Sequence, residues 1–256
     1  MSVLVFDIET VPDVETGRKL YSLEELSNED VAKAMFALRR AKVGHDFLPH
    51  YLQKIVAISL VIANGSYLKV WSLGDETSDE RELIERFFSG IDKYTPTLVS
   101  WNGSGFDLPV SHYRALHHKI SAPTYWETGE NQQNFRWNNY LSRFHSRHLD
   151  LMDVLAGYQT KAFAPLDEVA SMLGFPGKMG MHGGKVWEEY LSGNIKAIRD
   201  YCETDVLNTY GVYLRFELMR GVINQTEYHD AIERLRHYLN GETGREHLQA
   251  FSEKIL

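Results

Sequence analysis

Strand-forming sequence in this chain lies before residue 102, and helix-forming sequence dominates after residue 148. Short runs of β-branched and apolar residues, each bounded by polar or turn-forming residues, predict buried strands. Asn64 and Gly65, between two of these runs, are typical of a tight hairpin turn. This distribution predicts an α/β fold in which helices flank a mixed β-sheet. The predicted strands cover Val3–Phe6, Lys54–Ile62, Tyr67–Trp71 and Thr97–Trp101.

Helical periodicity covers much of the remaining chain. Between the first two strands, Val31, Met35 and Leu38 have helical spacing within Leu23–Lys42, which we interpret as an insertion on the outside of the sheet. The segment Ser121–Arg147 is polar and aromatic-rich without a clear period, and it predicts a long loop near the working face. The other predicted helices cover Asp107–His118, Leu149–Tyr158, Pro165–Leu173, Val186–Leu191 and Ile195–Arg220, and two weaker ones follow Thr226.

A single domain accounts for the whole pattern. The chain has 256 residues, of which 43% are hydrophobic and 24% are charged, and this composition supports a sizeable core. We expect residues 1–220 to form the α/β domain, with the helical insertion over residues 23–50. Residues 221–256 are expected to form a helical extension that packs on the same domain.

Asp7 and Glu9 end the first predicted strand. Side chains two residues apart on a strand project from the same face, so both carboxylates can bind one cation. Hard cations such as Mg²⁺ prefer oxygen ligands, and a carboxylate pair together with a substrate phosphate is a sufficient site. Two acids at the end of a strand are also common without a metal, so this motif by itself assigns no site.

Asp107 lies where a glycine-containing turn leads from the fourth predicted strand into a helix. We expect this strand to lie beside the first one, which places Asp107 at a helix N-terminus on the same edge. An aspartate at such a position often only caps the helix. The segment is Asn102-Gly103-Ser104-Gly105-Phe106-Asp107-Leu108-Pro109.

Tyr201 and Asp205 are four residues apart on a predicted helix, so they share one helix face. Glu203, between them, is predicted to point elsewhere and to be solvated. A tyrosine and an aspartate at this spacing would carry little weight without the other motifs. The helix is identified by an apolar stripe formed by Ile195, Ile198, Cys202, Val206 and Tyr210.

The ordered combination of these three motifs resembles the DEDDy class of 3′-to-5′ exonucleases, which belong to the ribonuclease H-like superfamily. The segments around Asp7 and Asp107 are especially similar to the proofreading domains of family-B DNA polymerases. The chain is most similar to stand-alone exonucleases that resemble those domains without an attached polymerase, over about Val3 to Leu218. The resemblance therefore implies a ribonuclease H-like mixed β-sheet.

Two further segments resemble elements of the same proofreading domains. They are His148–Asp153 and Leu166–Gly174. Asp150 and Asp153, in the first of them, are expected to cap a helix or to be solvated rather than to act in catalysis.

The resemblance implies a metal-dependent enzyme that removes nucleotides from a 3′ end and releases nucleoside 5′-monophosphates. It also implies two divalent cations, Mg²⁺ or Mn²⁺. Asp7, Glu9 and Asp205 would hold one cation, while Asp7 would bridge to a second one that Asp107 supports. Tyr201 would orient the attacking water and the scissile phosphate through its hydroxyl group.

Substrate contacts are expected from Thr10 and Asn102, which match family positions near ribose or phosphate, and from Phe106 beside the terminal base. A core position beneath the glycine loop would suit Phe106 equally well. Aromatic and arginine side chains in the 121–147 segment suit stacking on single-stranded ends, although an ordinary, partly buried loop would have a similar composition. The expected partner is nucleic acid with a free 3′ end. Single-stranded DNA is favoured, and the alternatives are an RNA-trimming enzyme similar to ribonuclease D and a non-catalytic nucleic-acid-binding module of the same fold.

The formal net charge of −8 argues against a protein that coats duplex DNA through a basic surface. It is compatible with a nuclease, because clustered carboxylates add to the total and bound cations reverse their local sign. Cys202 is the only cysteine, which excludes an intramolecular disulfide and fits a cytoplasmic location. No signal peptide, membrane helix or membrane anchor is expected.

Overall fold

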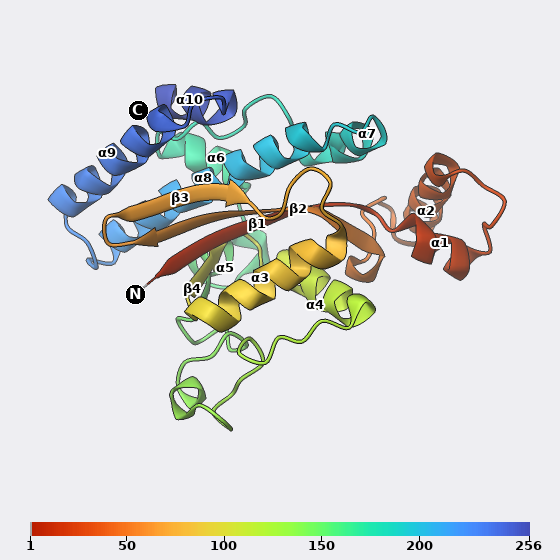
Figure 1. The fold of residues 1–256 in the computed structure, drawn as a ribbon, viewed down its shortest axis with the longest axis horizontal. Helices are drawn as coiled ribbons and strands as arrows, with labels where there is room; N and C mark the ends of the chain where they lie inside the picture. The colour runs from red at the N-terminus through yellow and green to blue at the C-terminus, as the bar shows by residue number, and fades with distance from the viewer. Residues whose placement is uncertain (1) are drawn as a thin grey trace.

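A five-stranded mixed β-sheet forms the centre of the protein, whose computed structural model describes residues 2–256. Its strands are β1 (Val3–Pro12), β2 (Gln53–Asn64), β3 (Tyr67–Ser72), β4 (Thr97–Ser100) and β5 (His148–Asp150). Their order across the sheet is β3-β2-β1-β4-β5 (Figure 1). β1 pairs antiparallel with β2 and parallel with β4, which confirms both the α/β fold and the predicted neighbour of the first strand.

Successive side chains of β1 point to opposite faces of the sheet. Phe6 and Ile8 belong to the hydrophobic core on one face, whereas Val5 belongs to the core on the other face. Asp7 and Glu9 continue the row that begins with Val5. The two carboxylates therefore project toward the layer that packs on Val5.

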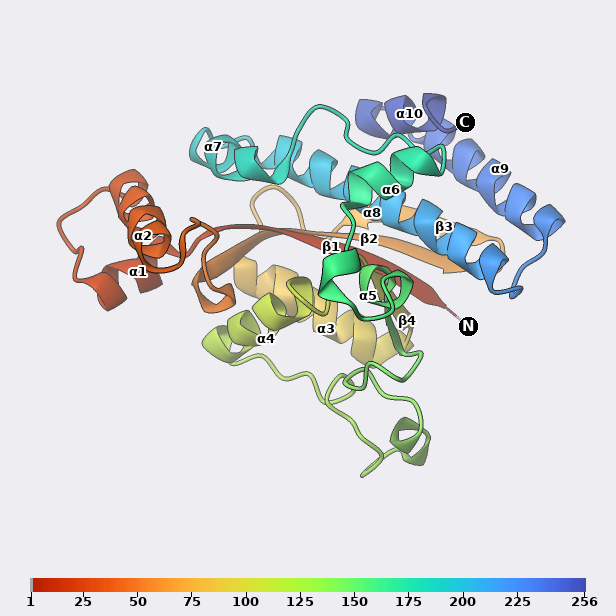
Figure 2. The same ribbon diagram turned by 180° about the vertical axis from the view of Figure 1, so that it is seen from behind.

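Helices cover both faces of the sheet, as the two opposite views in Figures 1 and 2 show. On the face of Phe6 lie α3 (Glu80–Tyr94) and α4 (Asp107–His118). On the face of Val5 lie α6 (Leu166–Met172), α8 (Ile195–Met219), α9 (Gln225–Gly241) and α10 (Glu246–Glu253). The acidic row of β1 thus lies under the long helix α8. The shorter α7 (Val186–Leu191) packs on the last residues of β1.

β1 is longer than predicted, because it continues through the acidic pair to Pro12. Asp7 pairs with Ser59 of β2, and the pairing changes register between Glu9 and Thr10. The two acids therefore lie inside the strand and not at its end. Acidic residues are unusual inside strands, so the sequence pattern predicts that the strand ends at Asp7. In the structure, β2 supplies pairing partners up to Pro12, and β1 therefore continues.

The helical insertion also begins earlier than predicted. It consists of α1 (Val14–Tyr21) and α2 (Asn28–Val43). Val31 and Met35 are buried as the spacing predicts, but Leu38 is 46% exposed. The reason is that α2 buries only a narrow stripe against α1 and the following segment, so one of the three apolar positions faces solvent.

Two further elements differ from the sequence predictions. α3 is absent from the predicted elements, although Leu83, Phe87 and Ile91 have helical spacing and are buried. The helix predicted over Leu149–Tyr158 is in fact the short strand β5 followed by α5 (Leu151–Leu155). A three-residue strand is too short for a period to distinguish it from the start of a helix.

The two C-terminal helices pack on α8 and on the sheet. Leu235 of α9 and Phe251 of α10 are buried in the same core as Val206 of α8. The Tyr238 hydroxyl accepts a hydrogen bond from the Val70 N–H at 3.1 Å, which ties α9 to β3. Among residues 2–256, no helix combines the length and the apolar character that a membrane crossing requires.

Irregular segments connect these elements. The segment predicted as a long loop contains one short turn of helix and is otherwise without helix or strand until β5, so the prediction of a loop is confirmed. The short 3₁₀ helices cover His50–Leu52, Gln133–Arg136, Thr160–Ala162 and Gly183–Lys185.

A buried ion cluster fixes α4 against the end of β1. The Arg114 guanidinium donates hydrogen bonds to Glu80 at the start of α3 and to Asp13 directly after β1. All three side chains are buried, so each charge depends on its partners for compensation. Because α4 begins at Asp107, this cluster also sets the position of the Asp107 carboxylate relative to β1.

Replacing Arg114 with methionine is expected to lower the free energy of unfolding by about 3–5 kcal/mol, because Asp13 would remain buried without a cation and Glu80 would keep only His118 as a possible one. Urea denaturation followed by circular dichroism measures the change. Arg86→Met is the matched control, since Arg86 is exposed and pairs only with Glu82; its effect is expected to stay below about 1 kcal/mol. Equal losses in the two variants would contradict the assigned role of the cluster.

Candidate metal centre

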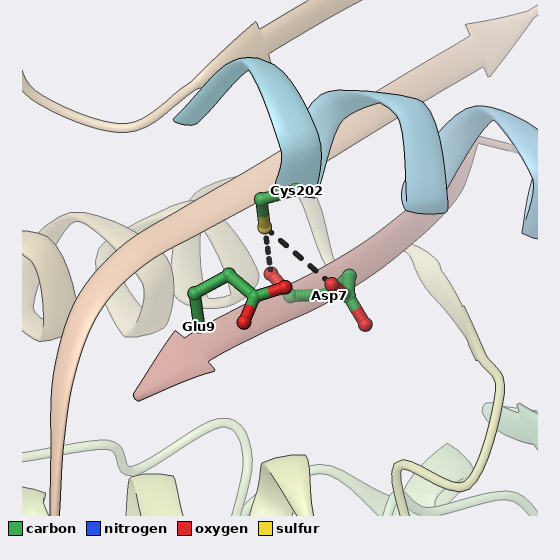
Figure 3. A group of neighbouring side chains, drawn as sticks. All are labelled: Asp7, Glu9 and Cys202. Atoms are coloured by element: carbon green, nitrogen blue, oxygen red, sulfur yellow. Dashed lines mark hydrogen bonds between the residues drawn. The ribbon is translucent and has the colours of Figure 1, made fainter. Parts of the chain in front are cut away.

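Asp7 and Glu9 of β1 lie directly beneath Cys202 of α8, as Figure 3 shows. One ligand atom from each of the three residues lies within 4.8 Å of the others. The Cys202 thiol donates weak hydrogen bonds to the Asp7 carbonyl oxygen at 3.4 Å and to Asp7 Oδ2 at 3.5 Å. Glu9 and Cys202 are buried, whereas Asp7 is partly exposed. Asp7 and Glu9 therefore lie between the sheet and α8, where solvent reaches Asp7 more than Glu9.

Asp107 reaches the same region from the N-terminus of α4. Its Oδ1 accepts a hydrogen bond from the Ile8 N–H at 3.1 Å. β4 pairs with β1 only over Val3–Val5, so β4 leaves the later part of this edge of β1 without a ladder partner. The Asp107 carboxylate accepts the hydrogen bond that a neighbouring strand would otherwise accept, and it therefore lies beside Ile8, the residue between Asp7 and Glu9.

Tyr201 and Asp205 extend from α8 toward β1. Tyr201 and Asp205 lie one helical turn apart on α8, and each side chain shifts the pKa of the other. The charge of Asp205 raises the pKa of both Asp7 and Glu9, so its carboxylate faces the same region. The structure therefore gathers the five residues around β1, but among residues 2–256 the group of three ligand residues whose atoms all lie within 4.8 Å at this site is Asp7, Glu9 and Cys202.

Burial raises the pKa of all four carboxyl groups, and repulsion within the cluster adds to the effect at Asp7 and Glu9. The pKa of Asp7 is well above its ordinary value because of burial first and the charges of Asp107, Glu9 and Asp205 second. Burial, followed by the charges of Asp205 and Asp107, likewise raises the pKa of Glu9. Burial raises the pKa of Asp107 to about 7 and that of Asp205 to about 6. The cluster therefore carries more negative charge at neutral pH than its surroundings stabilise.

No basic side chain that the structure describes forms an ion pair with this cluster, and Lys178, which lowers the pKa of Asp205, acts on it only from beyond ion-pair distance. Within residues 2–256, none of the four carboxylates forms an ion pair with a lysine, arginine or histidine. Buried carboxylates without a counter-charge are costly and must take up protons or bind cations. Burial raises the pKa of the Cys202 thiol, so the available ligand atoms are carboxylate oxygens. A set of oxygen ligands fits a hard divalent cation such as Mg²⁺ or Mn²⁺.

Asp150 holds the turn that leads into α4. Its carboxylate accepts hydrogen bonds from the N–H groups of Asn102 at 3.0 Å and Ser104 at 2.8 Å, and it caps α5 through the Met152 N–H at 3.1 Å. The predicted capping role is confirmed. The link to the turn was not predicted, although a tight turn with left-handed Asn102 leaves N–H groups that need an acceptor. Asp150 thereby fixes the segment from which Asp107 extends.

Glu203 is buried, contrary to the prediction that it is solvated. Its exposed fraction is 5%. It accepts a hydrogen bond from the Ser72 hydroxyl at 2.8 Å, and it contacts Arg245 and His247. The prediction was wrong because α10 covers this side of α8, and the pattern of one helix does not show which later segment packs on it.

A second group of possible metal ligands surrounds this glutamate. It consists of Asp200, Glu203 and His247. Arg245 pairs with Glu203, and Lys196 pairs with Asp200. Because basic side chains balance its charge, this group differs from the cluster on β1 and is explained as the contact that holds α10 on α8.

Thr10 and Phe106 line a cavity of about 640 Å³ that also includes Glu9. Phe106 also packs against the hydrophobic core, as one of the two predictions for it states, whereas its contact with a terminal base stays a prediction. The Thr10 hydroxyl donates a hydrogen bond to Gln53 Oε1 at 3.0 Å, a partner that the sequence motifs did not indicate. Asn102 does not line this cavity, and its backbone N–H and carbonyl groups are used within the turn.

The aromatic side chains of the 121–147 loop divide into two groups. Phe135 and Tyr140 are buried, and the Arg147 guanidinium lies 4.1 Å from the centre of the Phe135 ring. Trp126 and Trp137 are exposed by 52% and 80%. The first group stabilises the loop, and the second remains accessible to a ligand. The buried group agrees with the interpretation as a partly buried loop, whereas stacking on single-stranded ends stays a prediction.

Comparisons with known proteins agree with this geometry. A family described as predicted 3′-5′ exonucleases related to the exonuclease domain of PolB matches residues 45–255, which include Asp107, Tyr201 and Asp205 but not the two acids of β1. The catalytic subunits A of DNA polymerase epsilon from Emericella nidulans and Aspergillus fumigatus are each 27% identical over 143 residues, which cover 54% of this chain and 6% of the polymerase.

A solved structure shows the same fold. The family B DNA polymerase of Pyrobaculum calidifontis superposes with a TM-score of 0.51 at 17% sequence identity. The superposition covers 97% of this chain and 27% of the polymerase chain. This chain therefore spans only a small part of the length of the polymerases that it resembles.

The stability of the metal-free protein is expected to rise as the pH falls from about 8.5 to about 6.5. The pKa of Asp107 is about 7 in the folded protein, and those of Asp7 and Glu9 are also well above the unfolded values near 4, so the folded state takes up protons first. Below this window, His112 and His148 lower the stability as the pH falls further, because burial lowers their pKa in the folded protein to about 4. Denaturation in EDTA at a series of pH values measures the trend, and a fall in stability over the window would contradict the raised pKa values.

Asp7→Asn is expected to raise the free energy of unfolding in EDTA at pH 8 by roughly 0.5–2 kcal/mol, because it removes one of the mutually repelling charges. Asp230→Asn, at an exposed position on α9, is the control and is expected to change stability by less than about 0.5 kcal/mol. A loss of stability in Asp7→Asn would show that the carboxylates do not repel one another in the folded protein.

Proposed function

We propose that this chain, which belongs to the family of predicted 3′-5′ exonucleases related to the exonuclease domain of PolB, is a metal-dependent exonuclease that acts on the 3′ end of single-stranded DNA. In the proposed reaction, the oxygen of a water molecule bonds to the terminal phosphorus, and the bond from that phosphorus to the 3′ oxygen of the preceding nucleotide breaks. A proton from the water passes to the leaving 3′ oxygen, and a nucleoside 5′-monophosphate is released.

One observation carries this proposal: Asp7, Glu9, Asp107 and Asp205 gather in a largely buried cluster that forms no ion pair with a basic side chain of residues 2–256. A module that only binds nucleic acid recognises phosphate through lysine or arginine side chains. A carboxylate cluster repels phosphate unless cations lie between them. The cluster therefore favours an enzyme that uses cations over a binding module.

Two divalent cations, Mg²⁺ or Mn²⁺, are proposed at this cluster. Asp7, Glu9 and Asp205 would hold one of them, and Asp7 together with Asp107 would hold the other. Such cations, when bound, lower the pKa of a water molecule and offset the charge on the leaving oxygen. They would also replace the protons that the buried carboxylates otherwise need near neutral pH.

Tyr201 is proposed to orient the water molecule and the scissile phosphate. Burial, followed by the charge of Asp205, raises its pKa far above the ordinary value for tyrosine, so the hydroxyl stays neutral. A neutral hydroxyl donates one hydrogen bond and accepts others, which suits a group that positions both a nucleophile and an oxygen acceptor.

DNA is proposed as the substrate because the curated relatives and the structural relative are DNA polymerases. The exposed Trp126 and Trp137 support a single-stranded substrate, since unpaired bases stack on accessible aromatic rings. A cytoplasmic location is proposed because the one cysteine, Cys202, is a free and buried thiol, which is compatible with a reducing compartment.

The purified protein is expected to shorten 5′-labelled single-stranded DNA from its 3′ end with Mg²⁺ or Mn²⁺ and to stop in EDTA. Asp7→Ala is expected to lower the rate by about 100-fold or more, because the residue is shared by both proposed cations. Glu24→Ala removes an exposed acid outside the cluster and is expected to keep the wild-type rate. Faster shortening of RNA would favour the RNA-trimming alternative. Binding of ends that is unaffected by EDTA, without cleavage of either polymer, would favour the non-catalytic module.

Tyr201→Phe is expected to lower kcat by about 10- to 100-fold and the affinity for Mn²⁺ by a smaller factor, because the hydroxyl orients reactants and is not itself a proposed metal ligand. Single-turnover kinetics and calorimetric titration with Mn²⁺ measure the two quantities. Tyr94→Phe, at an exposed position, is the control. Unchanged kcat in Tyr201→Phe would rule out the proposed role of the hydroxyl.

A further inference from the structure

The ligand atoms that lie nearest to one another at the candidate metal centre include a sulfur atom. Asp7, Glu9 and Cys202 each offer one atom within 4.8 Å of the others. In Figure 3, the thiol of Cys202 extends from α8 toward the two acids of β1. This set, called the mixed ligand set below, therefore offers two hard oxygen ligands and one soft sulfur ligand.

We infer that the mixed ligand set is an inhibitory site for Zn²⁺, at which the Cys202 thiolate is a metal ligand. The inference rests on the proposed exonuclease function and adds a regulation of the same site. Mg²⁺ and Mn²⁺ bind carboxylate oxygens and leave the thiol protonated. When Zn²⁺ binds, a Zn–S bond forms, the S–H bond breaks, and the proton passes to solvent water.

The distance between the thiol and the Asp7 carboxylate fits a tetrahedral Zn²⁺ ion. Zn–S and Zn–O bonds of about 2.3 Å and 2.0 Å that meet at a tetrahedral angle place sulfur and oxygen about 3.5 Å apart. Cys202 Sγ lies 3.5 Å from Asp7 Oδ2. The two atoms therefore already have the separation of two ligands of one Zn²⁺ ion, which would replace the weak hydrogen bond between them.

Glu9 can supply the second oxygen without giving up another contact. It is 9% exposed, and in the part of the chain that the structure describes its carboxylate has no hydrogen-bond or ion-pair partner. Leaving a buried carboxylate without a partner is costly, so a cation on this side of β1 stabilises it. This carboxylate is an observation independent of the thiol, and it also points to a bound cation.

The elements that carry the three ligands are fixed before any cation binds. Asp7 and Glu9 lie in the ladder between β1 and β2. Cys202 is fully buried in one core with Ile198 of α8 and Val56 of β2. A buried cysteine is by itself ordinary core packing. Cys202 differs from that case because its sulfur faces carboxylates, so the backbone does not have to move for the three side chains to bind one ion.

Zn²⁺ in the mixed ligand set excludes the cations of the proposed reaction. Asp7 is the residue proposed to hold both of those cations, and Glu9 is proposed to hold one. Zn²⁺ favours tetrahedral coordination, whereas Mg²⁺ is octahedral and keeps several waters. A Zn²⁺ ion with three protein ligands therefore has too few free positions for both a water molecule and a phosphate oxygen. Zn²⁺ also binds such ligands more tightly than Mn²⁺ does, so it competes at low concentration.

Titration with Cd²⁺, followed by ultraviolet absorption, tests the sulfur ligand directly. A Cd²⁺–thiolate bond gives a charge-transfer absorption, and Cys202 is the only cysteine of the chain, so the signal has one source. We expect absorption that saturates at about one Cd²⁺ per chain in the wild type and none in Cys202→Ser. Cd²⁺ at Asp200, Glu203 and His247 would add no such signal, because that group contains no sulfur. Lack of this absorption in the wild type at saturating Cd²⁺ would overturn the inference.

Calorimetric titrations with Zn²⁺ and Mn²⁺ compare Cys202→Ser with a matched control. We expect Cys202→Ser to raise the Kd for Zn²⁺ about 10-fold or more and the Kd for Mn²⁺ by much less, because only Zn²⁺ uses the sulfur. The control is Thr209→Ser, since Thr209 is buried on the same helix and its hydroxyl donates a hydrogen bond to the Asp205 carbonyl oxygen. Equal Kd values for Zn²⁺ in the wild type and Cys202→Ser would contradict the inference. The wild-type Cd²⁺ spectrum decides the question even if the variant does not fold.

An assay with labelled DNA separates this inference from the proposed function. Zn²⁺ is expected to stop Mn²⁺-supported shortening by the wild type at a lower concentration than shortening by Cys202→Ser, each measured against its own rate without Zn²⁺. A thiolate signal without any shortening of DNA would reject the proposed reaction and leave the Zn²⁺ site standing. Shortening of DNA without a thiolate signal would reject the Zn²⁺ site and leave the reaction standing.

Discussion

Repulsion among buried carboxylates is the constraint on which the rest of this structure depends. Three parts of the fold hold the carboxylates of Asp7, Glu9, Asp107 and Asp205 together. They are the ladder between β1 and β2, the start of α4 and the buried side of α8, and each of them is stabilised by contacts outside the cluster. None of them has a basic partner at close range within residues 2–256. The metal-free protein therefore stores an unfavourable interaction that divalent cations would relieve.

The fold tolerates this repulsion because strong contacts surround the cluster without neutralising it. Arg114 joins the end of β1 to α3 and α4, and Asp150 fixes the turn before α4. Glu203 ties α8 to α10 through Arg245 and to β3 through Ser72. Each of these groups is a buried or partly buried charge with partners. The candidate metal centre therefore follows a common pattern, in which a destabilising group of side chains is held in place by stabilising contacts around it.

Sequence reasoning can name the side chains that the structure gathers around β1, because the signals are local. A two-residue spacing on a strand and a four-residue spacing on a helix fix which side chains share a face, and the resemblance to exonuclease motifs joins Asp7, Asp107 and Asp205 before any fold is known. What the sequence does not predict depends on contacts between distant segments. The continuation of β1 to Pro12 depends on pairing with β2, and the burial of Glu203 depends on α10. α3 is different, because its apolar spacing was present in the sequence and was missed.

The central claim is that the carboxylates of Asp7, Glu9, Asp107 and Asp205 bind divalent cations. The most direct test is to locate Mn²⁺ by anomalous diffraction from crystals of the protein. The account predicts anomalous peaks at Asp7, with Glu9, Asp107 and Asp205 supplying the other oxygen ligands. It would be contradicted by crystals in which this cluster stays empty at saturating Mn²⁺, or in which the ion binds instead at Asp200, Glu203 and His247.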